Sequence, residues 1–394
     1  MAQSVTGLAP ILAVTQNARR NFVIATIAFL TLVDLFAAQA ILPALAQSYA
    51  VSPSVAGLAV NACTLGMAVA SLAVALLSAR IERRRGVVIS LCLLSAPTLL
   101  LGFAPDIATF AALRAMQGLC MATAFSLTLA YLGENCLSHA AGGAFAAYIA
   151  GNVASNLVGR LLSALLVDHL GLRFNFIALA LLNLAGAALA LVSLRAGRRA
   201  AADFASGAGL AGIRANIERP EQRSAYLIGF CILAAFIGAF TFVNFVLARP
   251  PISLDSMAIG LVYFVFAPSL LTTPLAGAAV ASFGARGALL AGLALAILGL
   301  PFLLSVNLTL MLCGLTMVGV GAFFAQAVAS SYVATQAREN RGAASGLYLA
   351  SYFSGGLVGA AALGLTFERF GWPACVAGVF LALACAALAS RNLR

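Results

Sequence analysis

The sequence predicts an all-α integral membrane protein with twelve transmembrane helices, arranged as two similar six-helix bundles. Three observations lead to this prediction. Hydrophobic residues make up 63% of the chain, charged residues only 8%, and the mean hydropathy is +1.06. Short polar breaks separate long apolar runs. One long polar segment, 195–223, divides six apolar runs from six more.

The chain is long enough for this number of spans. A helix needs about 20 mostly apolar residues to cross the hydrocarbon core, so twelve spans use roughly 240 of the 394 residues. Lipid cannot hydrogen-bond an open backbone, so each span must be a helix or part of a closed barrel. The runs are continuously apolar rather than strictly alternating, which favours helices.

Polar and proline-containing breaks delimit the spans in order. In the first half they are expected at about 22–42, 54–78, 87–103, 107 onward, 142–167 and 175–194, with Pro43 ending the first. In the second half they are expected at about 225–247, 257–280, 287–305, 308–332, 342–367 and 372–389. Pro268 and Pro274 interrupt the eighth span, as a hinge or as a kink that neighbouring groups satisfy.

The predicted domains are an N-terminal six-helix bundle (1–194), a cytoplasmic linker (195–224) and a C-terminal six-helix bundle (225–394). Residues 208–218 of the linker are expected to form a short surface helix. An offset of 200 positions relates the halves, since Gly142, Tyr148, Gly159 and Gly171 recur as Gly342, Tyr348, Gly359 and Gly371. A parallel six-span repeat places the substrate between its halves, near the middle of the membrane.

Arginines set the predicted orientation, because the chain contains no lysine. With the N-terminus inside, seventeen arginines fall on the cytoplasmic side and three, Arg173, Arg249 and Arg369, fall outside. This asymmetry predicts that both termini are cytoplasmic. We expect the protein to be integral to the plasma membrane, which is the inner membrane of a bacterium. The formal charge of +11 therefore reflects topology and contact with membrane lipid, and we expect no nucleic-acid partner.

Small residues at a spacing of four predict close helix packing in the fifth span. Gly151, Ser155 and Gly159 lie on one helix face, and the pattern recurs as Ser351, Gly355 and Gly359. Such ridges let two helix backbones approach closely where lipid supplies no hydrophobic drive. We expect each ridge to contact a neighbouring span.

Three motifs resemble those of the major facilitator superfamily. The segment 113–118, with Arg114, Gln117 and Gly118, resembles the arginine-containing motif implicated in coupling in proton antiporters. The turn 75–85 resembles the superfamily's signature turn and keeps Arg80, Arg83 and Arg84, although Ala79 replaces its aspartate. The copy at 277–286 is degenerate. Span five, segment 240–245 and segment 248–251 together resemble the arabinose-efflux-like branch, which is related to drug–proton antiporters.

The resemblance implies that spans one, four and five are neighbours, which brings three intramembrane charges together. Asp34, Arg114 and Arg160 all lie about 10 Å below the outer surface, at 1.5 Å per residue. A charge at the bilayer centre costs about 2.5–3.5 kcal/mol, so these three need a reason. One interpretation is a structural ion pair. The other is a proton switch with Asp34 and Arg114 as coupling residues, because arginine stays charged and only the carboxylate can titrate.

Polar side chains on other spans predict a substrate cavity, or alternatively helix-to-helix hydrogen bonds. The candidates are Gln117 in span four; Tyr148, Asn152, Asn156 and Arg160 in span five; Thr241 and Asn244 in span seven; Gln326 and Ser330 in span ten; and Tyr348 and Tyr352 in span eleven. Such a cavity suits a sugar, an amphipathic drug or a small organic anion. Arg80, Arg83 and Arg84 are the candidate cytoplasmic gating turn.

The leading functional hypothesis is a proton-coupled exporter of a small organic solute, such as a sugar, drug or metabolite, working by alternating access. The alternatives are a uniporter or exchanger of an anionic metabolite, and a membrane receptor or scaffold that does not transport. Eight scattered cysteines and two histidines predict no metal site, and no motif predicts a cofactor or an enzyme active site. We expect a monomer whose partners are protons, membrane lipid and a small-molecule substrate.

Overall fold

The computed structural model describes residues 8–77, 81–135, 138–195, 210–336 and 341–393. Within these residues, nine helical segments are long and apolar enough to cross a membrane. Three of them, Ala147–Ser193, Ser256–Leu304 and Ala343–Asn392, contain 47, 49 and 50 residues. At about 20 residues per crossing, each of these three is long enough to cross twice. Counting these three twice gives twelve crossings, a number that stays a prediction.

The helices of the first half are α1 (Leu8–Ala40), α2 (Leu42–Ser48), α3 (Pro53–Asn61), α4 (Cys63–Leu77), α5 (Arg83–Leu101), α6 (Ile107–Asn135) and α7 (Ser138–Ser193). The linker contributes α8 (Leu210–Glu218), which confirms the predicted surface helix. The remainder comprises α9 (Pro220–Leu247), α10 (Ser256–Val262), η2 (Tyr263–Phe266), α11 (Ala267–Thr272), η3 (Thr273–Leu275), α12 (Ala276–Gly299), η4 (Leu300–Leu304), α13 (Leu308–Gln336), α14 (Arg341–Ala389) and η5 (Ser390–Asn392).

Glycine breaks the three longest apolar segments where the sequence predicts turns. Gly171, Gly284 and Gly371 have φ angles of 82°, 72° and 80°, and they lie inside α7, α12 and α14. A residue with a side chain adopts this left-handed conformation only at a cost, whereas glycine does so freely. Each glycine therefore separates two helical stretches that are otherwise continuous.

Prolines start helices in this fold more often than the sequence analysis expects. The first span ends at Ala40, and Pro43 lies in the first turn of α2 rather than closing α1. Pro268 and Pro274 likewise occupy the first turns of α11 and η3. Proline is tolerated there because the first N–H groups of a helix have no intrahelical partner. The eighth predicted span is thus a succession of short α and 3₁₀ helices whose junction residues keep helical φ and ψ angles.

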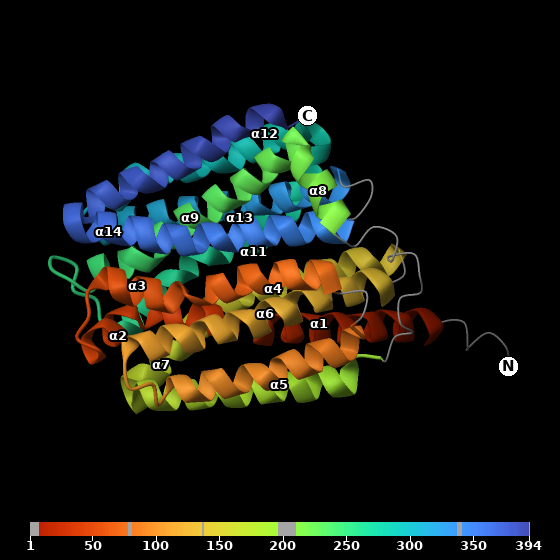
Figure 1. Cartoon of the computed structure of the whole chain (residues 1–394), viewed down its shortest axis with the longest axis horizontal. Helices are drawn as coiled ribbons and strands as arrows, with labels where there is room; N and C mark the ends of the chain where they lie inside the picture. The colour runs from red at the N-terminus through yellow and green to blue at the C-terminus, as the bar shows by residue number, and fades with distance from the viewer. Residues whose placement is uncertain (1–7, 78–80, 136–137, 196–209, 337–340, 394) are drawn as a thin grey trace.

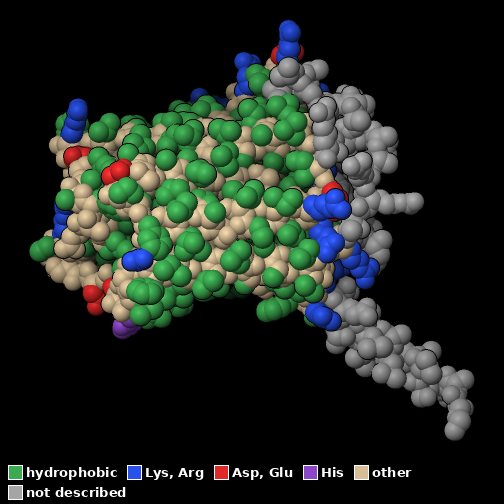
Figure 2. Space-filling view, turned by 60° about the horizontal axis from the view of Figure 1, so that its bottom comes forward, with side chains coloured by type: hydrophobic (Ala, Val, Ile, Leu, Met, Phe, Trp, Pro, Cys, Tyr) green, Lys and Arg blue, Asp and Glu red, His purple; other side chains and the backbone are tan. Residues whose placement is uncertain are grey.

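Figure 1 shows α1–α7 as a lower layer and α9–α14 as an upper layer, with all long helices running along the same direction. We call the end that holds residues 81–85, 210–219 and 390–393 the linker end. The opposite end, with residues 49–53, 102–106, 248–255 and 305–307, is the distal end. In Figure 2, apolar side chains cover the surface between the two ends, and charged side chains gather near the ends. This distribution is that of a protein embedded in lipid.

The two small-residue ridges pack as predicted. A Cβ atom on Gly151 would lie 2.1 Å from the carbonyl oxygen of Ala25 in α1, and one on Gly355 would lie 2.1 Å from that of Phe230 in α9. Ser351 also donates a hydrogen bond to the carbonyl oxygen of Tyr226 over 2.9 Å. The prediction that each ridge contacts a neighbouring span is confirmed for α7 against α1 and for α14 against α9.

Replacing Gly151 with alanine is expected to destabilise the protein by about 1–3 kcal/mol, because the added methyl group would displace the backbone of α1. Thermal unfolding in detergent, followed by loss of the monodisperse species, measures the effect. Gly277→Ala is the matched control, since a Cβ atom at that position meets nothing within 4 Å. Equal melting temperatures for the two variants would show that the ridge does not require glycine.

The two halves contact each other closely toward the distal end. There α7 packs against α10, η2 and α11, and α14 packs along α3. Toward the linker end α14 also packs along α4, where a Cβ atom on Gly346 would lie 2.2 Å from the Cβ atom of Ala75. A Cβ atom on Gly57 in α3 would lie 3.0 Å from the ring of Phe242 in α9. The main neighbours of α12, which continues the same path toward the linker end, are α13 and α14 of its own half. The predicted division into domains at 194 and 225 stays a prediction.

Candidate transport site

Asp34 lies in the interior of the first half, where its side chain is 1% exposed. Its Oδ2 atom accepts a hydrogen bond of 2.7 Å from Asn183 Nδ2 of α7, and the hydroxyl of Thr98 in α5 is 3.3 Å from the same oxygen. Oδ1 has no hydrogen-bond partner. The carboxyl group therefore has one oxygen held by the protein and one that is open to a proton.

Arg114 of α6 uses all its donors beside this acid. Its Nε atom donates to Val60 O over 2.9 Å. Its Nη1 atom donates to Asp34 O over 3.0 Å and to Gln117 Oε1 over 2.6 Å. Its Nη2 atom donates to Leu35 O over 3.5 Å and to Cys63 Sγ over 3.1 Å. A guanidinium group has five N–H donors. Each of the five donors thus has an acceptor. Three of the acceptors are main-chain carbonyl oxygens of α1 and α3, which lie next to the guanidinium group.

Close packing of α6 against α4 gives Arg114 this position. A Cβ atom on Gly118 would lie 1.9 Å from the carbonyl oxygen of Cys63, so only glycine permits the approach. Gln117 then connects the arginine to the acid, because its Nε2 atom donates to Thr98 Oγ1 over 2.7 Å. One continuous hydrogen-bond network therefore contains Arg114, Gln117, Thr98, Asn183 and Asp34.

The expected meeting of one carboxylate with two guanidinium groups is not present in this conformation. Among the described residues, neither Arg114 nor Arg160 forms an ion pair with Asp34. Arg114 contacts the main-chain oxygen of Asp34 rather than its carboxylate. Arg160 has other partners, because the packing of α7 directs its guanidinium toward the second half.

Arg160 lies between the halves and is 0% exposed. Its Nη2 atom donates to Gln39 Oε1 of α1 over 2.5 Å. The guanidinium carbon is 3.7 Å from the ring centroid of Tyr263 in η2, a cation–π contact across the interface. The rings of Phe36 and Phe266 complete its surroundings at 5.7 and 5.6 Å.

Thr241 and Asn244, two predicted cavity residues of α9, belong to this interface. Asn244 Nδ2 donates to Gln39 O over 2.9 Å, and Tyr263 donates to Asn244 Oδ1 over 2.6 Å. Asn61 of α3 donates to Thr241 Oγ1 over 3.2 Å and accepts from Gln39 Nε2 over 3.1 Å. These buried hydrogen bonds join the halves on the distal side of the centre.

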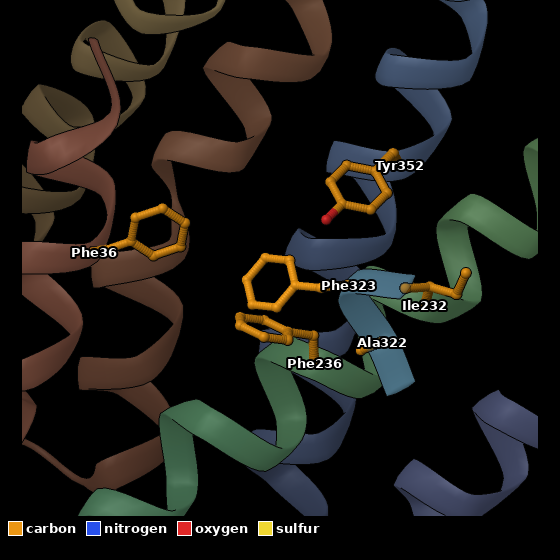
Figure 3. A pocket seen from close by; sticks show the side chains of 6 residues that line it. All are labelled: Phe36, Ile232, Phe236, Ala322, Phe323 and Tyr352. Atoms are coloured by element: carbon orange, nitrogen blue, oxygen red, sulfur yellow. The ribbon is translucent and has the colours of Figure 1, made fainter. Parts of the chain in front are cut away.

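A cavity of about 30 Å³ lies next to this interface, lined by Phe36, Ile232, Phe236, Ala322, Phe323 and Tyr352. Figure 3 shows the side chain of Phe36 facing the others across the space, with the hydroxyl of Tyr352 directed into it. A cavity of this size has room for only a few water molecules. The lining is mainly aromatic, and no sugar or drug fits until the halves move apart.

The remaining predicted residues of span five separate into two groups. Tyr148 packs with Ile24, Ala28 and Leu132, and its hydroxyl donates to Phe125 O over 3.2 Å, which is the helix-to-helix bonding alternative. Asn152 is half-buried, and its Oδ1 atom has no partner. Asn156, one turn from Arg160, is fully buried with neither Oδ1 nor Nδ2 hydrogen-bonded.

Of the remaining predicted residues of the second half, Tyr348, Gln326 and Ser330 lie toward the linker end from the cavity. Tyr348 is 2% exposed, stacks on Tyr352 at 6.1 Å and has an unpaired hydroxyl. Gln326 is half-buried, one turn beyond Ala322 and Phe323 on α13. Ser330 donates to Ala327 O of its own helix over 3.1 Å.

The candidate gating turn is only partly described, because Arg80 lies outside the described residues. Arg84 joins α5 to the end of α7 by donating to Leu191 O over 2.5 Å, whereas Arg83 is largely buried. Glu82 caps α5, accepting from the N–H groups of Arg84 and Arg85 over 3.1 and 2.9 Å. Glu82 therefore stabilises the start of α5 within this turn.

Sequence reasoning missed several members of both networks: Gln39, Asn61, Thr98, Asn183, Tyr263 and the phenylalanines of the cavity. The amides carried a usable signal, since a polar side chain inside an apolar span needs a partner from another helix. Tyr263 and the phenylalanines carried none, because aromatic residues are common in any span.

At the distal end, Glu368 of α14 links the halves by accepting hydrogen bonds from Ser52, over 3.1 Å, and from Ser54. Glu368→Ala is expected to loosen this contact and to speed amide hydrogen exchange in α3 by about three- to tenfold, since such a bond contributes about 1 kcal/mol. Hydrogen–deuterium exchange mass spectrometry checks this, with the exposed neighbour Arg369→Ala as control. Unchanged hydrogen exchange in both variants would show that the contact of Glu368 with Ser52 and Ser54 does not hold the halves together at the distal end.

The sequence resembles known membrane transporters over most of its length. The family model of the Major Facilitator Superfamily matches residues 24–267. The uncharacterized MFS-type transporter YybF of Bacillus subtilis (strain 168) is 28% identical over 348 residues, which cover 87% of this chain and 85% of YybF. The inner membrane transport protein YnfM of Escherichia coli (strain K12) is 25% identical over 373 residues, which cover 91% and 86%.

Solved structures agree in fold. The crystal structure of a bacterial homologue of the human lysosomal transporter Spinster, inward-facing and unoccupied, has a TM-score of 0.79 at 15% identity and covers 96% of this chain and 97% of that chain. A crystal structure of the nucleoside transporter NupG has a TM-score of 0.73 at 11% identity, with coverages of 95% and 98%. The chain belongs to the major facilitator superfamily and is a membrane transporter rather than an enzyme.

Proposed function

We propose that this protein is a proton-coupled secondary transporter that exports a small organic solute by alternating access. The observation that carries the proposal is the state of Asp34: a buried carboxyl group in mid-span, without an ion pair and with Oδ1 unbonded. Burial favours the neutral acid, whereas the nearby positive charge of Arg114 favours the carboxylate. A helix movement that changes the burial of Asp34, or its distance from Arg114, therefore makes the carboxyl group release or bind a proton.

The contacts between the halves support the alternating-access part of the proposal. Hydrogen bonds of Gln39, Asn61 and Asn244 join the halves on the distal side, and Glu368 joins them at the distal surface. These bonds have to break for the distal end to open. Arg114 hydrogen-bonds the backbone of α1 at Asp34 and Leu35, so tilting of α1 changes the surroundings of the acid.

Orientation and direction of transport belong to the same proposal. Basic side chains gather at the linker end in Figure 2, which by the positive-inside rule is the cytoplasmic end. The conformation described here, joined at its distal end, is then closed toward the outside. Export is supported by the sequence resemblance to arabinose-efflux-like proteins, and the inner membrane by the relative YnfM. We propose that the protein acts as a monomer.

A transport screen in inside-out vesicles tests the proposal. Sugars, antimicrobials and organic acids are offered with and without an acidic lumen, and a protonophore collapses the gradient in a parallel sample. The proposal expects at least one solute to accumulate only when the lumen is acidic. Accumulation that ignores the gradient would favour a uniporter or exchanger, and binding without accumulation would favour a receptor or scaffold.

The uniporter or exchanger of an anionic metabolite stays the second candidate. It is favoured by one observation: the described spans bury two arginines, Arg114 and Arg160, but only one carboxylate, Asp34. An anion that crosses the membrane at the same rate with and without a pH gradient would select it.

A further inference from the structure

Two arginines are equally buried in this protein, yet the protein satisfies only one of them. Arg114 and Arg160 are both 0% exposed. Every N–H group of Arg114 has an acceptor within the first half. Arg160 has one acceptor, Gln39 Oε1, and its Nε and Nη1 atoms have none. Buried donors without acceptors are rare and costly, so two buried arginines, one with all its donors bonded and one without, call for different explanations.

The charge of Arg160 is also uncompensated. No carboxylate of the described residues forms an ion pair with it, and its closest partners are an amide and the rings of Tyr263, Phe36 and Phe266. A cation held by an amide and aromatic faces keeps its full positive charge in a region of low dielectric. An anion entering this region would find both a counter-charge and empty donors.

A second unpartnered group lies one helical turn away. Asn156 is fully buried on the same face of α7, and neither its Oδ1 nor its Nδ2 atom has a hydrogen-bond partner. Nδ2 offers two further N–H donors. Residues four apart on a helix are neighbours, so Arg160 and Asn156 present donors to one region between the halves.

The cavity beside Arg160 adds the second chemical feature. Phe36 belongs to both sites, since its ring lines the cavity and lies 5.7 Å from the Arg160 guanidinium carbon. Phe266 packs against Phe236 and Phe323 of the cavity at 5.7 and 5.5 Å, and against Arg160 at 5.6 Å. The arginine and the cavity are thus separated by one layer of aromatic rings, and the hydroxyl of Tyr352 is directed into the cavity from the opposite side (Figure 3).

We infer that the substrate is an amphipathic organic anion, with an acidic group bound by Arg160 and Asn156 and an apolar or aromatic body in the phenylalanine-lined cavity, which has to widen as the halves move apart to admit it. This inference rests on the proposed transport function and narrows its substrate class. A polyhydroxylated sugar fits poorly, because a largely aromatic lining leaves its hydroxyl groups without partners. A cationic drug is repelled by the uncompensated guanidinium.

The test uses matched probes that share one apolar body. Naphthoate and naphthalenesulfonate carry an acidic group, naphthamide is neutral, and naphthylmethylamine is cationic. Their binding to the purified protein in nanodiscs is measured by calorimetry, with protein-free nanodiscs subtracted. We expect both anions to bind more tightly than the amide, and the amine to bind most weakly. Binding of the amide as tight as that of naphthoate, or no binding of either anion, would overturn the inference.

Substitutions locate the effect. Arg160→Gln keeps a hydrogen-bonding partner for Gln39 but removes the charge, and it is expected to weaken anion binding by about 10- to 100-fold, the equivalent of one charged hydrogen bond. Binding of the amide is expected to stay the same. Arg173→Gln is the control, because Arg173 also stacks on an aromatic ring, Phe103 at 4.1 Å, but is exposed. An anion preference that survives in Arg160→Gln would contradict the assignment.

Stability separates a binding role from a structural one. If Arg160 is kept for a ligand, Arg160→Gln melts at the wild-type temperature or above, since it removes an uncompensated buried charge. If its role is to join the halves, the variant melts at a lower temperature and all probes bind as before. Should Arg160→Gln fail to fold, Asn156→Leu carries the same binding test, because it removes the neighbouring donors and leaves the arginine.

The two proposals fail in different ways. Anion binding that depends on Arg160, together with transport that ignores the pH gradient, would refute proton coupling and leave the substrate class standing. Proton-driven export of neutral or cationic solutes, without binding of either anion, would refute the substrate class and leave proton coupling standing.

Discussion

Asp34→Asn is expected to abolish proton-driven accumulation of solute, down to the level of protein-free vesicles, while the protein stays folded. Asparagine has nearly the same shape, and its Oδ1 atom still accepts the hydrogen bond that Asn183 donates to Asp34 Oδ2 over 2.7 Å. What it lacks is a group that binds and releases a proton. Exchange of labelled solute across the membrane without any gradient is expected to persist, because the proposed substrate-binding groups, Arg160 and Asn156, do not include this carboxyl group.

Accumulation and exchange are measured in the same proteoliposomes, so each variant serves as its own folding control. Asp106→Asn is the matched substitution outside the site. Asp106 caps α6 at the distal end, and its pKa lies below the ordinary value because the N–H group of Thr109 donates to it over 2.8 Å. Asparagine also caps helices, so this variant is expected to transport normally. Full accumulation by Asp34→Asn would rule out the proton switch.

Arg114→Lys is expected to destabilise the protein by about 3–5 kcal/mol, although the charge is kept. An ammonium group has three donors around one nitrogen, whereas the guanidinium spreads five over a planar fork. At least two of the five acceptors would lose their donor, and three of those acceptors are carbonyl oxygens of buried helices: Val60, Asp34 and Leu35. Thermal unfolding in detergent, together with expression level, measures the loss.

Arg85→Lys gives the comparison for that measurement. Arg85 is exposed and pairs with Glu82 at 3.8 Å, and surface pairs of this kind contribute about 0–1 kcal/mol. We expect its melting temperature to match that of the wild type. If Arg114→Lys were equally stable, the network around Asp34 would not fix the position of α1, and its proposed part in coupling would lose its structural basis.

Hydropathy and residue spacing are sufficient to predict most of the fold. Apolar runs of membrane length are helices in the structure, and the small-residue ridge at Gly151, Ser155 and Gly159 contacts α1 as expected. Both properties are local, because a helix satisfies its own backbone and places every fourth residue on one face. The role of Pro43 was misjudged for an equally local reason, since proline is compatible with the end of one helix and the start of the next.

The arrangement of the site depends on contacts that spacing does not encode. Arg160 has two partners that are far from it in the sequence. Gln39 lies 121 residues before it, and Tyr263 belongs to the second half of the chain. Which of two guanidinium groups faces Asp34 depends on helix rotation, and a rotation of one residue on a helix turns a side chain by about 100°. The family resemblance and a shared depth therefore placed Arg160 near an acid that it does not contact.

Proton movement itself tests the central claim most directly. Proteoliposomes containing a trapped pH indicator in a weak buffer are given a solute identified by the transport screen, with no gradient imposed. The wild-type protein is predicted to make the lumen alkaline as solute enters, and Asp34→Asn is predicted to admit solute by exchange with no change in pH. Solute entry through the wild type at constant pH, or the same alkaline shift in Asp34→Asn, would contradict the claim that this carboxyl group carries the coupled proton.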